Sequence, residues 1–187
     1  DPEDYAQARV WAPAADGTQI PVSLVWKRSF GEAGTAHRPL HLYGYGSYEH
    51  SIEPGFSVAR LSELDRGVVF AVAHVRGGGE MGRQWYEDGK LLAKRNTFTD
   101  FVDCARHLID SGYTTADRMV AEGGSAGGLL MGAVANLAPE LFASGPHSVR
   151  SDLWSLGVVL FEALLGREAS RGPMAAQSGQ APRISPS

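Results

Sequence analysis

The sequence has few of the features that tie a chain to a disulfide framework, a nucleic acid or a membrane. Its 187 residues include a single cysteine, Cys104, so no internal disulfide can form. The net charge of −4 gives no excess of basic residues, which argues against a nucleic-acid partner. The longest apolar stretch, residues 153–165, contains Ser155 and Glu162 and is too short to span a bilayer.

The chain also opens without the pattern of a signal peptide. Asp1-Pro2-Glu3-Asp4 is acidic, where a signal peptide needs a basic start followed by an apolar run. We therefore expect a cytoplasmic location and no membrane partner. The overall composition, 43% hydrophobic and 20% charged, is that of a globular protein with an ordinary core.

One stretch, residues 119–142, carries the strongest chemical signal. It reads as a short apolar strand, a glycine-rich turn and a helix, and Gly123-Gly124-Ser125-Ala126-Gly127 at its centre fits the G-x-S-x-G nucleophile elbow. Glycines at 123, 124, 127 and 128 are expected to make room for a sharply bent backbone. The helix start favours an oxyanion beside the serine. The alternative is a glycine-rich turn whose serine only caps a helix.

A second glycine-rich stretch does not predict a cofactor. Gly77, Gly79 and Gly82 formally match G-x-G-x-x-G after an apolar strand at 68–75. No helix-length pattern follows at once, and Glu80 would place a carboxylate beside a pyrophosphate. We interpret this stretch as a structural loop at the end of a sheet, and we expect neither a cofactor nor a metal.

The remaining pattern predicts an α/β fold with a mostly parallel sheet. The chain opens with a hairpin, in which residues 5–12 and 19–26 form strands around a turn at Asp16-Gly17. Alternating apolar runs and helical stripes then follow. Strands are expected at 40–43, 68–75 and 118–122, and helices at 58–65 and 96–111. Cys104 falls on the second helix and is expected to be a small buried hydrophobe.

Three blocks resemble the catalytic domain of the prolyl oligopeptidase family, and most closely its oligopeptidase B branch. They are HLYGYGSYEHSIEPGFS, HVRGGGEMGRQWYEDGKLLAKRNTFTDF and EGGSAGGLLMGAVANLAPELF, which occur in the order of that family at 41–57, 74–101 and 122–142. The resemblance implies a partial α/β-hydrolase fold over residues 1–142. It also implies a serine peptidase that acts on short peptides.

Carried over by position, the resemblance assigns five site residues. Ser125 is the nucleophile, and the backbone N–H of Ala126 and the hydroxyl of Tyr45 are the oxyanion donors. Tyr48 lies where the family has an aromatic residue in the substrate pocket. Glu53 matches one of the acidic positions that favour basic substrates, whereas Gly55 departs from the other. The resemblance therefore implies substrates that are cut after basic residues.

The resemblance ends near residue 142, before the family's catalytic Asp and His. In α/β-hydrolases the triad order is Ser, acid, His. After Ser125 the chain has only His147 and Asp152, in the wrong order and too close, so we do not assign them to a triad. The strands that follow the nucleophile strand in the family are also missing. We therefore expect that strand to form an open edge of the sheet.

The last part of the chain resembles a different family. Residues 138–167 contain Ala138-Pro139-Glu140 and the run SDLWSLGVVLFE, similar to the A-P-E and D-x-W-S-x-G segments of protein kinases. The glycine-rich loop, strand lysine, H-R-D and D-F-G that a kinase needs are absent, so phosphoryl transfer is excluded. We expect a kinase-like helical segment at 143–167 and a disordered tail at 168–187.

Two hypotheses from different classes follow from the sequence. In one, the chain is a serine-type oligopeptidase by descent, which alone is inactive because the triad Asp and His are missing. In the other, it is a truncated or chimeric product with no enzymatic role. The presence of the elbow favours the first, and the end of the resemblance at residue 142 favours the second.

Overall fold

The computed structural model describes residues 1–53, 55 and 57–137. The elements of the described residues alternate as an α/β fold requires. The strands are β1 (Tyr5–Pro13), β2 (Gln19–Lys27), β3 (Leu40–Gly44), β4 (Val69–Ala73) and β5 (Met119–Glu122). The α-helices are α1 (Val58–Leu64), α2 (Arg83–Glu87), α3 (Lys94–Asp110) and α4 (Ala126–Leu137). Short 3₁₀ turns lie at Pro2–Asp4, Arg28–Phe30, Leu91–Ala93 and Ala116–Arg118.

These bounds agree with the expected elements to within a few residues. The exception is α2, which we did not predict because five residues are too few to show a helical period. None of the helices in the described part of the chain is long and apolar enough to cross a membrane. The predicted kinase-like segment, the tail, His147 and Asp152 all lie outside the described residues.

The five strands form one mixed sheet with the order β1-β2-β4-β3-β5. β4 and β5 both run parallel to β3, as expected of the strands at 68–75 and 118–122. β2 pairs antiparallel with β1 and with β4, so two of the four described pairings are antiparallel. The expected predominance of parallel pairs is not seen, because the opening hairpin supplies two of the five strands.

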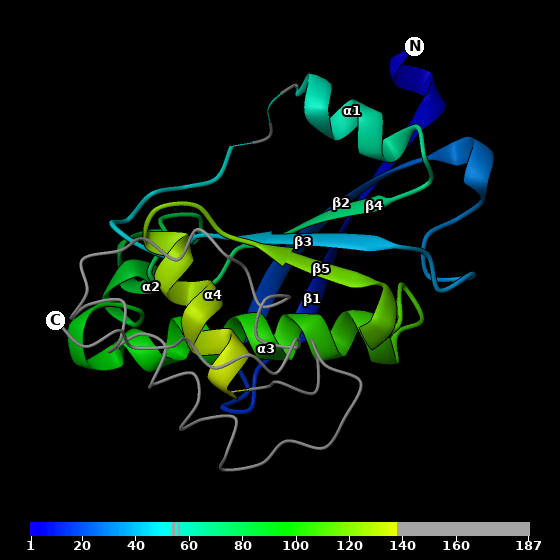
Figure 1. The fold of residues 1–187 in the computed structure, drawn as a ribbon. Helices are drawn as coiled ribbons and strands as arrows, with labels where there is room; N and C mark the ends of the chain where they lie inside the picture. The colour runs from blue at the N-terminus through cyan, green and yellow to red at the C-terminus, as the bar shows by residue number, and fades with distance from the viewer. Residues whose placement is uncertain (54, 56, 138–187) are drawn as a thin grey trace, which may run out of the picture. The chain divides into compact units, whose positions relative to one another are not determined.

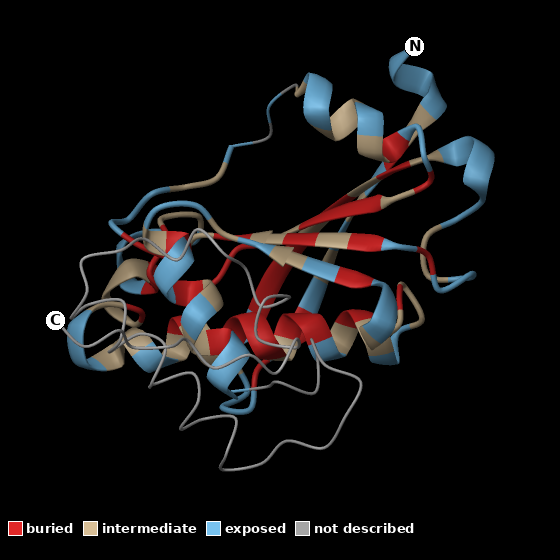
Figure 2. Ribbon diagram, viewed as in Figure 1, coloured by how far each residue is buried: buried red, intermediate tan, exposed pale blue. Residues whose placement is uncertain are grey.

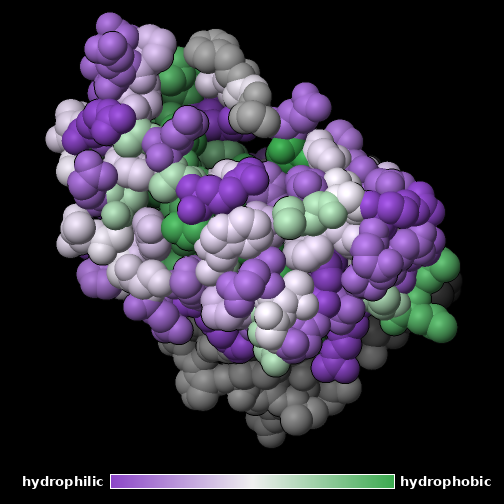
Figure 3. Space-filling view, turned by 180° about the vertical axis from the view of Figure 1, so that it is seen from behind, coloured by the Kyte–Doolittle hydropathy of each residue, from purple (hydrophilic) through white to green (hydrophobic). Residues whose placement is uncertain are grey.

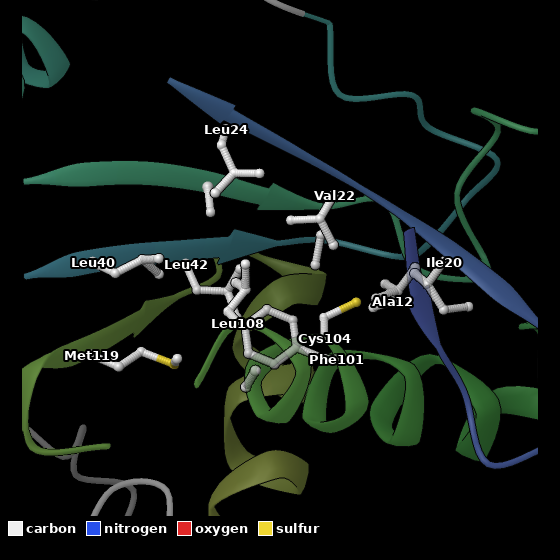
Figure 4. Close-up of a cluster of buried hydrophobic side chains, with 14 of the residues drawn as sticks. Ala12, Ile20, Val22, Leu24, Leu40, Leu42, Phe101, Cys104, Leu108 and Met119 are labelled. Carbon is white, nitrogen blue, oxygen red and sulfur yellow. The ribbon is translucent and has the colours of Figure 1, made fainter. Parts of the chain in front are cut away.

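The helices lie on both faces of this sheet (Figure 1). α3 and α4 lie against one face and α1 covers the other. Leu40 and Leu42 of β3 point toward Phe101 and Leu108 of α3, and all four side chains are fully buried (Figure 4). Burying a side chain of this size contributes about 1.5–3 kcal/mol, so this layer is a main source of stability. Figure 2 shows the same layer as the buried centre of the fold.

Cys104 belongs to this buried layer, as predicted, and is fully enclosed. Burial raises the pKa of its thiol well above the usual value. Because the thiolate is the reactive form of cysteine, this residue is chemically inert in the folded chain.

A buried ion pair joins the loop after β4 to the middle of α3. The guanidinium of Arg76 donates to Asp100 from Nη2 at 2.5 Å and from Nε at 2.9 Å, and the Arg76 backbone N–H donates to the same carboxylate at 3.0 Å. Its third nitrogen, Nη1, reaches Asp16 in the hairpin turn at 2.6 Å. Arg76 is 6% exposed and Asp100 is fully buried. The pair therefore fixes three segments that are far apart in the sequence.

The glycines after β4 allow backbones to approach one another closely. A side chain on Gly77 would overlap the carbonyl oxygen of Gly46, and one on Gly79 would overlap that of Glu49. Glu80 turns inward, where its Oε1 accepts hydrogen bonds from His74 and from the Ile52 N–H. The stretch is thus a packed loop at the sheet end, in agreement with our structural interpretation of its glycine pattern.

α4 follows the elbow as predicted, but its buried face is narrower than expected. The helical spacing of Leu129, Leu130, Ala133, Val134 and Leu137 in the sequence predicts one apolar face. Gly127, Leu130 and Val134 are the buried residues, whereas Leu129 is 61% and Leu137 is 42% exposed. The helix contacts α3 and β5 along one stripe, and no other described element covers its outer side.

β5 forms one edge of the described sheet, as we expected. Its Val120 is 63% exposed, although Met119 beside it is buried in the core. The face of the molecule turned away from the viewer in Figure 1 is mainly hydrophilic (Figure 3). An exposed apolar residue on an edge strand is a site for pairing with another chain. The edge therefore favours self-association of the chain.

We predict that Val120→Lys reduces self-association, because a lysine on an edge strand opposes pairing with a second copy. Light scattering and the binding of a hydrophobic dye would measure the change. Leu92→Lys is the matched control, since Leu92 is 103% exposed but lies in the turn Leu91–Ala93, away from any strand edge. Equal effects of the two variants would show that general apolar exposure, and not the edge, drives association.

Candidate active site

Ser125 lies on a sharp turn between β5 and α4. Its φ angle is +55°, a left-handed conformation that is unfavourable for a residue with a side chain. Only two residues separate Glu122, which ends β5, from Ser125, and α4 begins at the next residue, Ala126. Serine in this conformation at a strand–helix junction is the geometry of a nucleophile elbow, and Ser125 is exposed there.

Two of the four elbow glycines are required by close packing. A Cβ on Gly123 would lie 2.5 Å from the carbonyl oxygen of Gly127, and one on Gly127 would lie 2.8 Å from that of Gly44. Gly124 faces open space, and a Cβ on Gly128 would meet nothing closer than 4.0 Å. Our expectation that all four make room for the bend is therefore wrong for 124 and 128. The strained φ angle belongs to the serine itself.

The start of α4 leaves a backbone donor beside the serine. The N–H groups of Gly127 and Gly128 donate at 2.8 Å to the carbonyl oxygens of Gly124 and Ser125. Among the described residues, no acceptor receives the N–H of Ala126. The first N–H groups of a helix carry partial positive charge. The Ala126 N–H is thus available to a developing oxyanion.

Tyr45 lies next to the elbow, on the segment that follows β3. A Cβ on Gly127 would lie 3.7 Å from the Tyr45 Cα and 3.8 Å from its ring. The Tyr45 ring also packs edge-on against the ring of His50, with 5.3 Å between centroids. The structure therefore brings a tyrosine from the end of β3 to the residues that follow the predicted nucleophile.

Two cavities flank these residues. The first has a volume of about 670 Å³ and is lined by Tyr45, Tyr48, Glu49, His50, Ser51 and Glu53. It contains three of the five predicted site residues, namely Tyr45, Tyr48 and Glu53. The second, of about 550 Å³, has Tyr48 and Ala126 in its lining. Tyr48 is 76% exposed and stands between them as a shared wall.

Most of the residues that line the second cavity were not predicted from the sequence. Its other lining residues come from the segment after β3, the loop after β4, residues 86–91, the first turn of α3 and α4: Ser47, Gly77, Tyr86, Gly89, Lys90, Leu91, Lys94 and Leu129. Their spacing follows no motif, because they meet only through the packing of separate elements. Leu91 has a φ angle of +48°, and no feature of the sequence indicated this left-handed backbone.

Three of the five described histidines, His37, His41 and His74, form polar contacts away from the elbow. His41 lies 2.9 Å from the carboxylates of both Glu63 and Glu122. His74 contacts Ser23 through Nε2 at 2.8 Å and Glu80 through Nδ1 at 3.2 Å. Among residues 1–53, 55 and 57–137, no histidine is hydrogen-bonded to the Ser125 hydroxyl.

The chain Ser23–His74–Glu80 has the order of hydrogen bonds found in a serine triad, and we did not predict it. Ser23 lies in the middle of β2, however, where neighbouring strands take up the backbone N–H groups. His74 is only 4% exposed. Without free donors for an oxyanion, the arrangement satisfies buried polar groups and does not form a second catalytic centre.

No metal centre accompanies the elbow in the described part of the chain. Within it, no three or more His, Cys, Asp or Glu side chains are grouped so that they could hold a metal ion. The chemistry available to the described residues is therefore that of an exposed serine with nearby hydrogen-bond donors.

Comparisons with known proteins agree with this geometry. The family model described as "Prolyl oligopeptidase family" matches residues 54–150. The dipeptidyl aminopeptidase BI of Pseudoxanthomonas mexicana is 57% identical over 143 residues, which are 76% of this chain and 20% of that protein. The protease 2 of Moraxella lacunata is 53% identical over 142 residues, again 76% of this chain and 20% of the relative.

Solved structures give the same result. Oligopeptidase B from Trypanosoma brucei, in a closed form with covalently bound antipain, is 53% identical with a TM-score of 0.72. The match covers 75% of this chain and 20% of that one. Oligopeptidase B from Leishmania major is 48% identical with the same TM-score, over 75% and 19% of the two chains. The chain thus spans about a fifth of the length of the relatives it matches.

We predict that Gly127→Ala lowers the free energy of unfolding by about 1–3 kcal/mol, because the new Cβ would clash with the Gly44 carbonyl oxygen. Gly124→Ala is the matched control and should change it by less than about 0.5 kcal/mol, since its Cβ meets open space. Urea denaturation followed by tryptophan fluorescence would measure both. A Gly124→Ala variant as unstable as Gly127→Ala would contradict this description of the elbow.

Proposed function

Because this chain belongs to the prolyl oligopeptidase family, we propose that its described residues form the nucleophile half of a serine peptidase site for short peptides. The observation that supports this most is the left-handed backbone of Ser125, at +55°, directly before the first residue of α4. A structural cap would not require a serine in an unfavourable conformation. Such strain is typical of a hydroxyl that must be presented to a substrate.

In this proposal Ser125 Oγ attacks the carbonyl carbon of the scissile peptide bond. The carbonyl oxygen becomes an oxyanion and accepts hydrogen bonds from the Ala126 N–H and the Tyr45 hydroxyl. The Ser125 proton passes to a base, the C–N bond breaks as that base returns the proton to the leaving amine, and water then hydrolyses the acyl-serine ester. Donors that are fixed in advance stabilise the charge as it develops, which is often the largest contribution to catalysis.

The described residues supply these donors but no base. The serine hydroxyl is a weak nucleophile until a neighbouring group takes its proton. In α/β-hydrolases a histidine, oriented by an acid, takes that proton, and both follow the serine in the sequence. Because no described histidine is hydrogen-bonded to the Ser125 hydroxyl, we propose that this chain alone turns over peptides poorly.

The first cavity supports a preference for basic substrate residues. It contains two carboxylates, of which Glu49 is already paired with Arg83 at 2.6 Å. Glu53 is exposed, and no described cation pairs with it. A lysine or arginine side chain entering the cavity past Tyr45 and Tyr48 would meet the Glu53 carboxylate. Tyr48 and Glu53 are thus the residues that we propose contact the substrate.

The alternative, a truncated or chimeric product without an enzymatic role, is favoured by a different observation. The described sheet ends at β5, and the described residues contain no base for Ser125. Under this alternative the chain has kept the elbow geometry by descent, but the elbow catalyses no reaction. The domain boundaries at residues 142 and 167 and the cytoplasmic location expected from the sequence stay predictions.

We predict that the chain cleaves a short fluorogenic peptide with arginine at the cut site at a rate close to that of its Ser125→Ala variant. Loss of a triad member leaves an acceleration of only about a thousandfold to ten-thousandfold over water. The increase of fluorescence with time is the measurement. Rapid turnover that disappears in Ser125→Ala would reveal a base in the chain, and His147→Ala would be the next variant to test.

A further inference from the structure

The segment that carries both candidate tyrosines has a strained backbone. Between the end of β3 and residue 50, the φ angles of Gly46, Tyr48 and Glu49 are +65°, +58° and +57°. Left-handed residues with side chains are unfavourable and persist only where surrounding contacts hold them. Tyr45 and Tyr48 therefore keep their positions through contacts from outside the segment.

Lys94 supplies such contacts from the first residue of α3. Its Nζ donates to the carbonyl oxygen of Gly46 at 2.5 Å and to the hydroxyl oxygen of Ser47 at 2.7 Å. Ser47 is 8% exposed. The two acceptors lie directly between the tyrosines in the sequence. One ammonium group thus binds the segment at its centre.

The stability of the fold does not explain why this residue is a lysine. Among the described residues, Lys94 forms no ion pair with a carboxylate, and its acceptors are neutral. Burial lowers the pKa of its ammonium group, which shows that the charge is partly removed from water. A partly buried cation without a counter-ion is usually unfavourable compared with an apolar side chain of similar size. Its ammonium group lies 5.9 Å from the centroid of the Phe98 ring, and its closest contacts are the charge-assisted hydrogen bonds to Gly46 and Ser47.

Lys90 provides a contrast within the same cavity. It also lines the second cavity, but it pairs with the carboxylate of Glu87 and lies over the ring of Tyr86, 4.8 Å from the centroid. No hydrogen bond links Lys90 to the described residues of the tyrosine segment. The two lysines therefore line the same cavity and carry the same charge, but only Lys94 is hydrogen-bonded to the segment between the two tyrosines.

We propose that Lys94 is a positioning residue that holds the Gly46 peptide so that the Tyr45 hydroxyl faces the oxyanion formed at Ser125. This inference rests on the proposed function, in which Tyr45 is an oxyanion donor. Lys94 touches neither the substrate nor the reacting atoms. It acts through the segment between the tyrosines. On the other side of Tyr45, Gly44 packs against Phe101 of α3.

The test uses the full chain and a peptide boronic acid with an arginine-like side chain next to the boron. Boron accepts an electron pair from the Ser125 oxygen, and the hydroxyl proton passes to water, so the tetrahedral anion forms without a base in the chain. Calorimetric titration gives the affinity of the chain and of Tyr45→Phe, Lys94→Met and the double variant. A double-variant cycle separates a role through Tyr45 from a general effect on the fold.

Tyr45→Phe should weaken binding about tenfold or more, because it removes one hydrogen bond to a charged group. We expect Lys94→Met to weaken binding to a similar degree, and the double variant to bind no more weakly than Tyr45→Phe alone. Lys90→Met, the matched control, should bind as the parent chain does. If Lys94→Met does not fold, Lys94→Gln, which keeps an amide donor without the charge, replaces it in the cycle.

Each other outcome contradicts a specific statement. If the losses from Tyr45→Phe and Lys94→Met multiply in the double variant, Lys94 does not act through Tyr45 and the inference is overturned. The same holds if Lys94→Met binds as Lys90→Met does. If instead Ser125→Ala and Tyr45→Phe both leave the affinity unchanged, the proposed function itself fails, and the role of Lys94 fails with it.

Discussion

The buried pair between Arg76 and Asp100 is the interaction on which the site depends. It ties the loop after β4 to the middle of α3, and through Asp16 it also ties the hairpin to that loop. Removing one partner of such a pair leaves an uncompensated buried charge, at a cost of about 3–5 kcal/mol. Because Asp100 sets the position of α3, the helix can present Thr97 and Lys94, three and six residues earlier, to the loops at the end of the sheet. Thr97 donates to the carbonyl oxygens of Arg76 and Gly89, and Lys94 donates to that of Gly46.

Close backbone contacts between glycines then fix those loops against one another. Gly46 fits only because it has no side chain, since a Cβ there would overlap Thr97 and Val75. Gly89 approaches the backbone of Arg76 and Gly77 with the same closeness. The segment after β3 therefore packs onto a platform made by α3 and the loop after β4. Gly127 brings the elbow against the end of β3, because its missing side chain leaves room for the carbonyl oxygen of Gly44.

Serine catalysis requires a positioned nucleophile with oxyanion donors, and it also requires a base. The described residues bear on the first requirement and not on the second. Local packing brings Ser125, Ala126 and Tyr45 together, and in the proposed function these three residues supply the nucleophile and the oxyanion donors. Removal of the serine proton requires a base, and no described histidine is hydrogen-bonded to the Ser125 hydroxyl. The chain covers about a fifth of the relatives it matches, and their similarity identifies a family and not the activity of this chain. Val120 on β5 and Leu129 on α4 are both exposed apolar side chains in the described part of the chain.

The sequence by itself predicted every described strand, three of the four described α-helices and the elbow that holds Ser125. Alternation of apolar residues and turn signals located all five strands, the helical stripe located α3, and the spacing of G-x-S-x-G located Ser125, because these are local patterns with fixed periods. The resemblance also supplied Tyr45, Tyr48 and Glu53, which the structure gathers in one cavity. Only the tertiary structure decided which elbow glycines are indispensable, why the sheet is mixed, and that Lys94 holds the segment between the tyrosines. The contact of Lys94 with Gly46 and that of Gly127 with Gly44 join residues that are 40 or more positions apart in the sequence. The periodicity of residues along the chain does not predict such contacts, because they arise when whole elements pack against one another.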